Sequence, residues 1–512
     1  MSLQKFPKAV RVGWGAVVVL AVVVLAALAG CGGSSGGDVD FTGSGYPGVD
    51  LANTRQVSGP INGSNVSELE VAWTLPLTGQ SSYGSYASTP IISKGVVYSQ
   101  DLASNVEAVN LESGEVLWAK KYEDPSHGPN GLAVDDGLVY GATASEAFAL
   151  DQETGKEVWS TKLTESATES IDMAPGYHDG KVFIATVPVT VNETYGAGAV
   201  GVLWALDGKT GKKVWHFDTV PKSLWGNPDV NSGGGLWYPP SFDGKGSVYI
   251  GTGNPGPLPG DPKHPWGSSR PGSNLYADSM VKLDEKTGKM DWYYQQTPHN
   301  IYDWDFQNPP VLVKAGGKEL AIGSGKSGVV VAIDAKTGKP VWKQPVGTHN
   351  GHDNDPIYAM KGEYSKIKTG EVFPGQLGGV IAPLATDGES VFVPIVNHSM
   401  TVVSGSELSE SSASTGELVA LDLANGKFKW KKKLPQAAYG APTVVNDLVF
   451  ETTFDGIVYA LDAKSGGEVW QATLPAGTNA GVMANGEYLV APAGLPVAEG
   501  QVAELVTYRL GG

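Results

Sequence analysis

Residues 149–159 read ALDQETGKEVW, and this stretch decides the fold because six further copies of it recur along the chain. In each copy an Asp (once an Asn) stands eight positions before a Trp, and a Gly stands four positions before it. The Asp can cap the amides of a turn, the Gly supplies a positive φ, and the following strand delivers the Trp to a seam between sheets. The repeat therefore predicts a series of β-hairpins. The six further copies end at Trp118, Trp215, Trp292, Trp342, Trp430 and Trp470.

The spacing of the repeats predicts how the hairpins are arranged. The shortest intervals between successive Trp residues, 41 from 118 to 159 and 40 from 430 to 470, match the roughly 40–45 residues of a four-stranded propeller blade. Trp73 lies 45 positions before Trp118 without a hairpin of its own, and residues 505–510 form a last strand-like run with no Trp after it. Pairing of these two ends would complete a blade and leave no exposed edge. We therefore expect an all-β fold, an eight-bladed β-propeller of four-stranded blades over residues 60–512, with its ring closed by pairing of the N- and C-terminal strands.

Composition and charge narrow the class of protein. The 512 residues include 69 Gly and 33 Pro but only 17% charged residues, which argues against a disordered chain or a coiled coil. The formal net charge of −17 disfavours binding to the phosphate backbone of nucleic acid. The single Cys excludes an intramolecular disulfide, a zinc cluster and a CxxCH haem attachment. Segments with helical periodicity are absent, so a βαβ fold is not expected.

The amino terminus has the pattern of an export signal. Three basic residues precede an apolar run over residues 17–28, and Leu28-Ala29-Gly30-Cys31 follows. This quartet resembles a bacterial lipobox, which implies a lipoprotein signal peptide over residues 1–30 and lipidation of Cys31. The Gly/Ser run GGSSGG over residues 32–37 predicts a flexible tether, taken over residues 31–59. An uncleaved anchor helix is the alternative. Either way the remaining chain is expected outside the cytoplasmic membrane, lipid-anchored to the outer face of the cell membrane or periplasmic.

Two long intervals between Trp residues, 215–292 and 342–430, predict insertions on one face, where binding sites are usually built. The first insertion and the segment after it resemble the pyrroloquinoline-quinone (PQQ)-dependent alcohol dehydrogenases. The matching motifs are Gly235-Leu236-Trp237, Gly251-Thr252-Gly253-Asn254-Pro255, Arg270-Pro271-Gly272-Ser273-Asn274-Leu275-Tyr276, Gln296-Thr297-Pro298-His299 and Tyr302-Asp303-Trp304-Asp305. The tandem repeat alone does not indicate the cofactor, because non-catalytic outer-membrane assembly lipoproteins carry the same repeat.

The resemblance implies a set of site residues around PQQ and a Ca²⁺ or lanthanide ion. Trp237 matches the aromatic floor beneath the quinone, Asn254 a metal-binding amide, and Asp303 the catalytic base that also binds the metal. Asp305 matches an additional metal carboxylate of the lanthanide-using branch, and we expect an Asp-Trp-Asp strand to point both carboxylates to one face. Each assignment has an ordinary alternative: another inter-blade Trp, a turn-capping Asn and two surface carboxylates.

Four further residues are assigned by the same resemblance. Glu193 is the acid nearest to the position of the family's metal glutamate, which itself corresponds to Gly196. Lys326 matches the cation at the quinone's carbonyl edge, where it could stabilise developing negative charge, although a solvated surface charge is the alternative. Ser170 and Asn397 are weaker cofactor-binding candidates.

The chain also departs from the family's pattern. It lacks the vicinal cysteine pair, and Asn130 stands where an arginine often grips a quinone carboxylate. Two functions therefore stay open. One is a quinoprotein dehydrogenase that oxidises an alcohol, sugar or aldehyde and passes electrons to a separate acceptor, a cytochrome or a quinone. The other is a propeller that serves as a binding or assembly scaffold.

Overall fold

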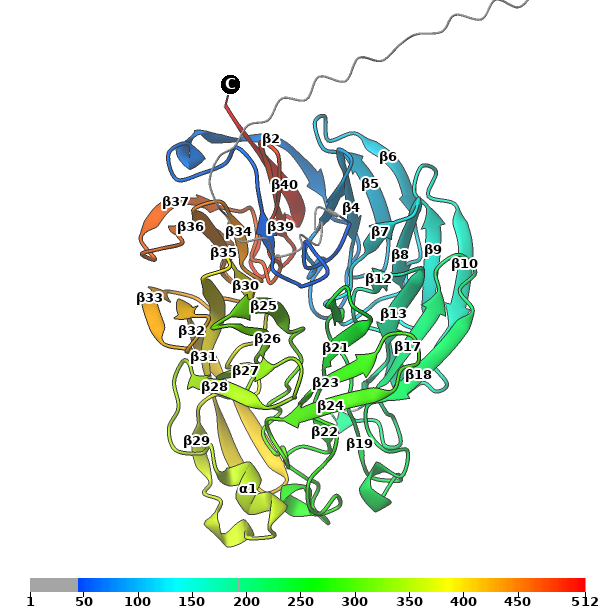
Figure 1. Cartoon of the computed structure of the whole chain (residues 1–512), viewed down its shortest axis with the longest axis vertical. Coiled ribbons are helices and arrows are strands. Elements are labelled where there is room, and N and C mark those ends of the chain that lie inside the picture. Colours follow the sequence, from blue (N-terminus) through cyan, green and yellow to red (C-terminus); the bar gives the residue numbers. More distant parts are fainter. Residues whose placement is uncertain (1–44, 192–193, 512) are drawn as a thin grey trace, which may run out of the picture. The chain divides into compact units, whose positions relative to one another are not determined.

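The computed structural model describes residues 45–191 and 194–511 and has an all-β architecture. Over these residues eight sheets of four or five strands, antiparallel apart from one short parallel pair, follow one another in chain order, and Figure 1 shows them succeeding each other around the molecule from blue to red. In the described part the only α-helix is α1 (Asp355–Met360), which lies in the second long insertion. The sequence analysis missed this helix, because a six-residue helix is too short to show a periodic pattern.

Each of the first four sheets has four strands in chain order, and the third and fourth sheets skip short strands that lie in loops. They contain β3 (Ile91–Ser93), β4 (Val96–Gln100), β5 (Val106–Asn110) and β6 (Val116–Lys120); β7 (Ala133–Asp135), β8 (Leu138–Ala142), β9 (Glu146–Asp151) and β10 (Glu157–Lys162); β12 (Gly176–His178), β13 (Lys181–Ala185), β17 (Val202–Asp207) and β18 (Lys213–Asp218); and β20 (Ser241–Phe242), β21 (Ser247–Gly251), β23 (Ser279–Asp284) and β24 (Met290–Gln295).

The last four sheets follow the same plan, and one of them joins the two ends. They contain β25 (Val311–Ala315), β26 (Lys318–Gly323), β27 (Val329–Asp334) and β28 (Pro340–Pro345); β29 (Gly370–Val372), β30 (Ala385–Thr386), β31 (Ser390–Ser404), β32 (Glu407–Asp422) and β33 (Phe428–Leu434); β1 (Gln56–Val57), β34 (Thr443–Val445), β35 (Leu448–Thr452), β36 (Ile457–Asp462) and β37 (Glu468–Thr473); and β2 (Leu69–Pro76), β40 (Glu504–Leu510), β39 (Tyr488–Ala493) and β38 (Met483–Asn485).

Short elements complete the loops. They are the two-residue strands β11 (Glu169–Ser170), β14 (Val187–Pro188), β15 (Thr190–Val191), β16 (Thr194–Tyr195), β19 (Ser232–Gly233) and β22 (Pro255–Gly256), and the 3₁₀ turns η1 (Val66–Glu68), η2 (Leu224–Gly226), η3 (Pro265–Gly267) and η4 (Tyr364–Lys366).

Strands from the two ends of the described chain share a sheet. β2 pairs antiparallel with β40, with Leu69 opposite Leu510 and Pro76 opposite Glu504. In Figure 1 the blue β2 lies beside the red β40. Both long edges of β40 are thus occupied, by β2 and by β39, so the last strand has no open edge.

The repeat residues do what their chemistry predicts. Asp151 Oδ1 accepts hydrogen bonds from the Thr154 backbone N–H (2.9 Å) and hydroxyl (2.6 Å), which caps the β9–β10 turn. Gly155 has φ +66°. Its Cα faces the Trp118 ring of the preceding sheet, and Trp118 Nε1–H donates to the Gln152 carbonyl (3.0 Å). The predicted Trp seam between sheets is confirmed, and six other Trp residues donate to a carbonyl of the next sheet's turn: Trp73, Trp159, Trp215, Trp292, Trp342 and Trp430.

The segment before residue 60 is packed onto the sheets from residue 45 onward. Carbonyls of this segment accept backbone hydrogen bonds from five sheets in turn, and β1 pairs parallel with β34. The structure describes part of the expected 31–59 tether, and this part is bound to the propeller sheets. Its carbonyls accept hydrogen bonds from backbone N–H groups of the inner strands. The donors are Val134, Phe242, Leu312, Thr386 and Val444.

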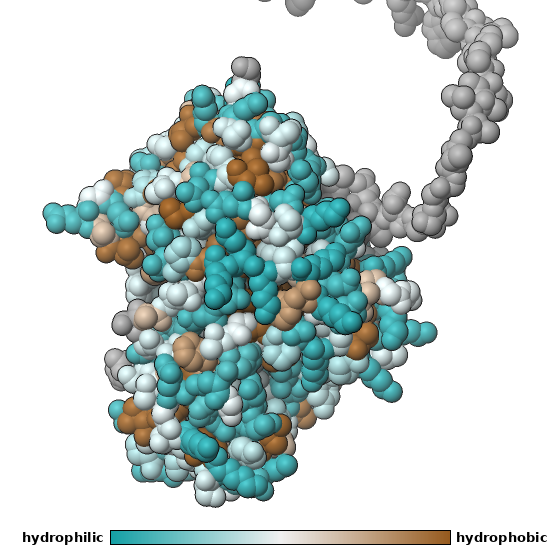
Figure 2. Space-filling view, turned by 90° about the vertical axis from the view of Figure 1, so that its left-hand side faces the viewer, coloured by the Kyte–Doolittle hydropathy of each residue, from teal (hydrophilic) through white to brown (hydrophobic). Residues whose placement is uncertain are grey.

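One face of the molecule is mostly polar. Figure 2 shows hydrophilic side chains over most of one face, with hydrophobic ones scattered in small groups. Among the described residues no helix combines the length and the apolar character that crossing a bilayer requires.

Candidate active site

A cavity of about 1040 Å³ collects residues from both insertions and from the loops between sheets. Trp237, Asp303, Asp305 and Lys326 all line it. Its volume lies slightly above the usual range of about 300–1,000 Å³ for small-molecule sites, so it is large enough for a cofactor together with a substrate. The structure thus brings four of the predicted site residues into one cavity.

Asp303, Asp305 and Lys326 form a buried charge cluster in this cavity. Lys326, between β26 and β27, places its Nζ 2.8 Å from Asp303 Oδ2 and 2.6 Å from Asp305 Oδ2. The two aspartates lie between β24 and β25, and the three side chains are between 0 and 14% exposed. Asp303 Oδ1 is buried and accepts no hydrogen bond from any described residue. One carboxylate oxygen of the cluster is therefore available to a ligand.

The two aspartates do not lie in a strand, contrary to the prediction. Asp303 has φ +61°, in the left-handed region, and the segment around it is irregular. Residues other than Gly rarely adopt this backbone conformation. Where one does, contacts with the surrounding structure stabilise it. The turn still directs both carboxylates to Lys326, so the predicted convergence of the two acids holds although its geometric reason was wrong.

Asn254 and Trp237 lie beside this cluster. The bridge between Thr252 and Phe306 aligns the 252–254 segment with the aspartate loop, and Asn254 N–H donates to Asp305 Oδ1 (2.6 Å). A Cβ at Gly253 would lie 2.9 Å from Asp305 Oδ1 and 3.2 Å from Trp237 Nε1. Because Gly253 has no side chain, both Trp237 and Asp305 can lie close to its backbone.

Burial sets the protonation chemistry of Asp303. Loss of solvation raises the pKa of Asp303 to about 7, Lys326 opposes the increase, and the carboxylate of Asp305 adds to it. Asp278 is also fully buried beneath the loop, and burial and the charge of Asp305 raise its pKa well above the ordinary value. Burial thus raises the pKa of both Asp303 and Asp278.

Asn300 and the motif residue Arg270 fix the loop that carries Asp303 and Asp305. Asn300 Oδ1 accepts the N–H groups of Tyr302 (2.9 Å) and Trp304 (3.1 Å), and its Nδ2 donates to Asp278 Oδ1 (3.0 Å). Arg270, fully buried, donates to the Asn300 carbonyl (2.7 Å). The conspicuous Arg-Pro-Gly-Ser-Asn motif therefore shapes the loop and does not line the cavity.

The second insertion also contacts the loop that carries Asp303 and Asp305. Tyr302 donates its hydroxyl to Asp355 Oδ2 (2.6 Å) at the start of α1, and Trp304 Nε1–H donates to the Pro374 carbonyl (3.0 Å). Both rings pack with Met400 and Val402 of β31. The two insertions together fix the backbone that carries Asp303 and Asp305.

Another part of the cavity wall carries a second acid that the sequence analysis did not single out. Asp172 is completely buried, and its Oδ1 accepts hydrogen bonds from Ser126 Oγ–H (3.1 Å), Ser170 Oγ–H (3.2 Å) and the His127 backbone N–H (3.1 Å). Asp172 and His127 both line the cavity. The available signal was an Asp in an apolar strand context, IDMAP, next to the candidate Ser170.

The remaining predicted residues fall in three places. Ser170 lies behind Asp172 and not on the cavity wall. Asn397 is not brought to the cavity, because its amide accepts the Thr348 N–H (2.8 Å) and donates to Glu417 Oε1 (3.1 Å), whereas the next residue, His398, lines the wall. Glu193 and Cys31 lie outside the described residues, so their roles stay predictions.

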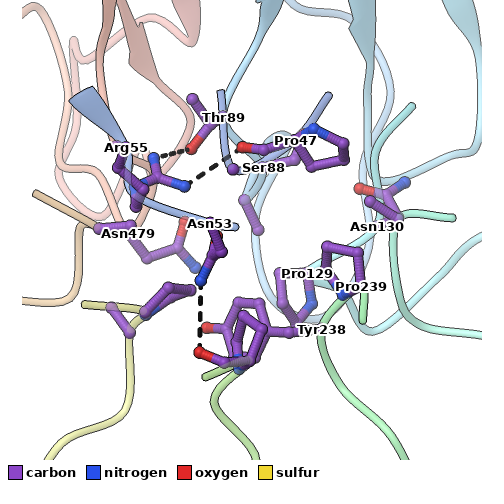
Figure 3. A pocket seen from close by; sticks show the side chains of 18 of the residues that line it. Pro47, Asn53, Arg55, Ser88, Thr89, Pro129, Asn130, Tyr238, Pro239 and Asn479 are labelled. Atoms are coloured by element: carbon purple, nitrogen blue, oxygen red, sulfur yellow. Dashed lines mark hydrogen bonds between the residues drawn. The ribbon is translucent and has the colours of Figure 1, made fainter. Parts of the chain in front are cut away.

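A small chamber of about 50 Å³ adjoins the large cavity. Tyr238 and Asn479 line both spaces. Figure 3 shows Arg55, from the packed N-terminal segment, reaching Thr89 and Pro47 across this chamber, with distances of 2.8 Å to Thr89 Oγ1 and 3.2 Å to the Pro47 carbonyl. The N-terminal segment thus forms one wall of the chamber next to the candidate active site.

Comparisons with known proteins indicate the family of the chain. A family profile described as the β-propeller domain of glucose, ethanol and alcohol dehydrogenases matches residues 56–133 and 171–346. The chain is 28% identical over 518 residues to the quinohemoprotein alcohol dehydrogenase of Comamonas testosteroni, covering 86% of this chain and 70% of that protein. The chain belongs to the PQQ-dependent alcohol dehydrogenase family.

Further matches extend over the same PQQ-type propeller. The quinoprotein alcohol dehydrogenase PedH of Pseudomonas putida is 28% identical over 483 residues, covering 80% of this chain and 78% of that protein. The crystal structure of the Comamonas enzyme superposes with a TM-score of 0.78 at 24% identity, over 92% of this chain and 81% of the other. A profile described as outer membrane protein assembly factor BamB matches residues 102–233 and 375–510.

The described residues fit the family's cofactor at one end of the cavity. The carboxylates of Asp303 and Asp305 and the neighbouring Asn254 offer the hard oxygen donors that Ca²⁺ or a lanthanide takes. Trp237 adds a flat aromatic surface, and Lys326 adds a cation. The described residues contain no group of three or more His, Cys, Asp or Glu side chains that could hold a metal by themselves, so an amide or a further ligand is needed.

Proposed function

We propose that the protein is a quinoprotein dehydrogenase that oxidises an alcohol, sugar or aldehyde, with PQQ and a Ca²⁺ or lanthanide ion held at the Asp303–Lys326–Asp305 cluster. The observation that carries this proposal is the convergence of two buried carboxylates and one ammonium group in a large cavity beside Trp237. Membership of the PQQ-dependent alcohol dehydrogenase family supplies the reaction class. Its characterised relatives are named for alcohol oxidation.

The residues of the cluster have separate tasks in this proposal. Asp303 Oδ1, which accepts no hydrogen bond within the described chain, takes the proton from the alcohol hydroxyl. Lys326 stabilises negative charge that develops at the carbonyl edge of the bound group. When bound, the quinone would supply a two-electron acceptor for the hydride from the carbinol carbon, and the cation would supply Lewis-acid chemistry. Asp303, Asp305 and Asn254 would hold the cation, and Trp237 would support the flat ring.

The wider setting follows from the amino terminus and the sheet order. We propose that the eight sheets act as blades of a closed ring, and that lipidation of Cys31 anchors the exported chain at the outer face of the cell membrane. The sequence contains no CxxCH motif for attaching haem, so electrons pass to a separate acceptor, a cytochrome or a quinone. The lipobox-like quartet supports the anchor.

Reconstitution tests the proposed function. The purified chain, loaded with PQQ and Ca²⁺ or La³⁺, is expected to reduce an artificial dye in the presence of an alcohol. Asp303→Asn removes the proton acceptor and is expected to lower turnover by at least about a hundredfold while PQQ stays bound. Asp291→Asn, at a half-exposed carboxylate paired only with Lys282, is the matched control and should keep full activity. Unchanged turnover in Asp303→Asn would exclude Asp303 as the base.

A scaffold function is the second candidate, and the match to the assembly-factor profile favours it. A protein of that kind has no use for a buried carboxylate–ammonium cluster facing a cavity. If the chain retains no quinone and reduces no dye with any of the metals, the scaffold function replaces the dehydrogenase.

A further inference from the structure

Asp172 is a buried carboxylate with one oxygen left open toward the cavity. Its Oδ1 is saturated by three donors, whereas Oδ2 accepts no hydrogen bond from the described residues. The nearest cationic group is His127 Nδ1, at 3.7 Å, beyond hydrogen-bonding distance. A buried carboxylate oxygen without a donor is costly, so its persistence points to a ligand that donates to it.

The charge of the cavity wall is the second observation. Among the described lining residues three carboxylates, of Asp172, Asp303 and Asp305, face one ammonium group, that of Lys326. Lys326 is bound to the Asp303–Asp305 pair, so among the described residues the imidazole of His127, 3.7 Å from Asp172 Oδ2, is the cationic partner nearest to Asp172. An anionic group of a ligand next to Asp172 would meet repulsion, whereas a cation would be attracted.

The surroundings of Asp172 suit an organic cation. Tyr83 lies edge-on to the His127 ring at 5.6 Å, and both line the cavity. Leu258, Phe454 and Leu495 add apolar surface to the same cavity. An ammonium group on an alkyl chain would therefore find a carboxylate for its charge and apolar wall for its chain.

We propose that Asp172 binds a protonated amine, so that the preferred substrate class is an alcohol that carries an ammonium group. The assignment of this ligand as a substrate rests on the proposed dehydrogenase function, whereas the amine-binding site does not. Asp172 Oδ2 accepts the N–H of the ammonium group, and the three donors on Oδ1 hold the carboxylate in place. His127 competes for the same oxygen when its imidazole is protonated.

Equilibrium binding tests the site without turnover. Isothermal titration of the full chain with hexylammonium, hexan-1-ol and hexanoate is expected to show the tightest binding for the cation. Asp172→Asn should weaken hexylammonium at least about tenfold, because it removes a charge-assisted hydrogen bond, and should leave hexan-1-ol unchanged. Glu165→Gln, at an exposed neighbouring carboxylate, is the control and should change neither. His127→Gln removes the competing cation and should strengthen hexylammonium binding.

Two results would overturn the proposal. One is tighter binding of hexanoate than of hexylammonium, with loss of hexanoate binding in His127→Gln, which would make this an anion site. The other is equal affinity of wild type and Asp172→Asn for hexylammonium. In the loaded enzyme, a higher kcat/KM for 6-aminohexan-1-ol than for heptan-1-ol, lost in Asp172→Asn, supports the substrate assignment. Binding of hexylammonium without oxidation of any alcohol supports the amine site and contradicts the dehydrogenase function alone.

Discussion

Replacing Gly155 by Ala tests the physical basis of the repeat. Gly155 has φ +66°, which costs a residue with a Cβ about 1–2 kcal/mol. The added methyl would also lie 2.5 Å from Trp118 Cε3 and 2.7 Å from its Cδ2, so the ring must move, at a further cost of about 1–3 kcal/mol. The two effects predict a loss of about 2–5 kcal/mol, a large part of the ordinary stability of a folded protein. Urea unfolding followed by tryptophan fluorescence measures this loss.

Gly137 provides a matched control in the same sheet. It has φ +78° in the β7–β8 turn, and a Cβ there would have no atom within 4 Å. Gly137→Ala should therefore lose only the backbone contribution, about 1–2 kcal/mol. Equal losses for the two variants would show that the Trp118 ring does not press on the turn and would refute the proposed origin of the seam.

Three further perturbations test other parts of the structure. Lys326→Met removes the ammonium group between two buried carboxylates, so bound La³⁺ should raise the melting temperature of this variant more than that of wild type. An equal rise in both proteins would contradict the cluster as the metal site. Arg55→Met leaves the Pro442 and Pro47 carbonyls without donors and should lose about 2–5 kcal/mol of stability, with faster proteolysis before residue 60 as the readout. The Glu285 hydrogen bond (2.7 Å) raises the pKa of His178, so this pair stabilises the fold below about pH 6.5 and the stabilisation is lost as pH rises through the raised pKa. His178→Gln should flatten that part of the stability–pH profile, and an unchanged profile would exclude the pair as its source.

Local chemistry made much of the architecture predictable. The spacing of Asp, Gly and Trp defines one hairpin geometry, and the structure shows the cap at Asp151 and the indole donation of Trp118 that this spacing predicts. The pairing of residues 69–76 with the final strand was also predictable, because a Trp without a hairpin and a strand without a Trp complement each other.

Other features depend on contacts that no local pattern encodes. Residues 45–57 resemble a polar linker in sequence, and only the unsatisfied N–H groups of five sheets give them a fixed place. The left-handed conformation of Asp303 depends on Asn300. Asp172 was missed because its role comes from donors on two separate loops, and Asn397 was misplaced because its partners lie outside the cavity.

A crystal structure of the chain grown with PQQ and Eu³⁺, with data collected at the europium absorption edge, shows whether Asp303 and Asp305 hold the cation beside the quinone. We predict one strong anomalous peak about 2.3–2.6 Å from carboxylate oxygens of both Asp303 and Asp305, with planar density beside Trp237. An anomalous peak elsewhere on the chain, or a cavity that contains only water, would contradict it.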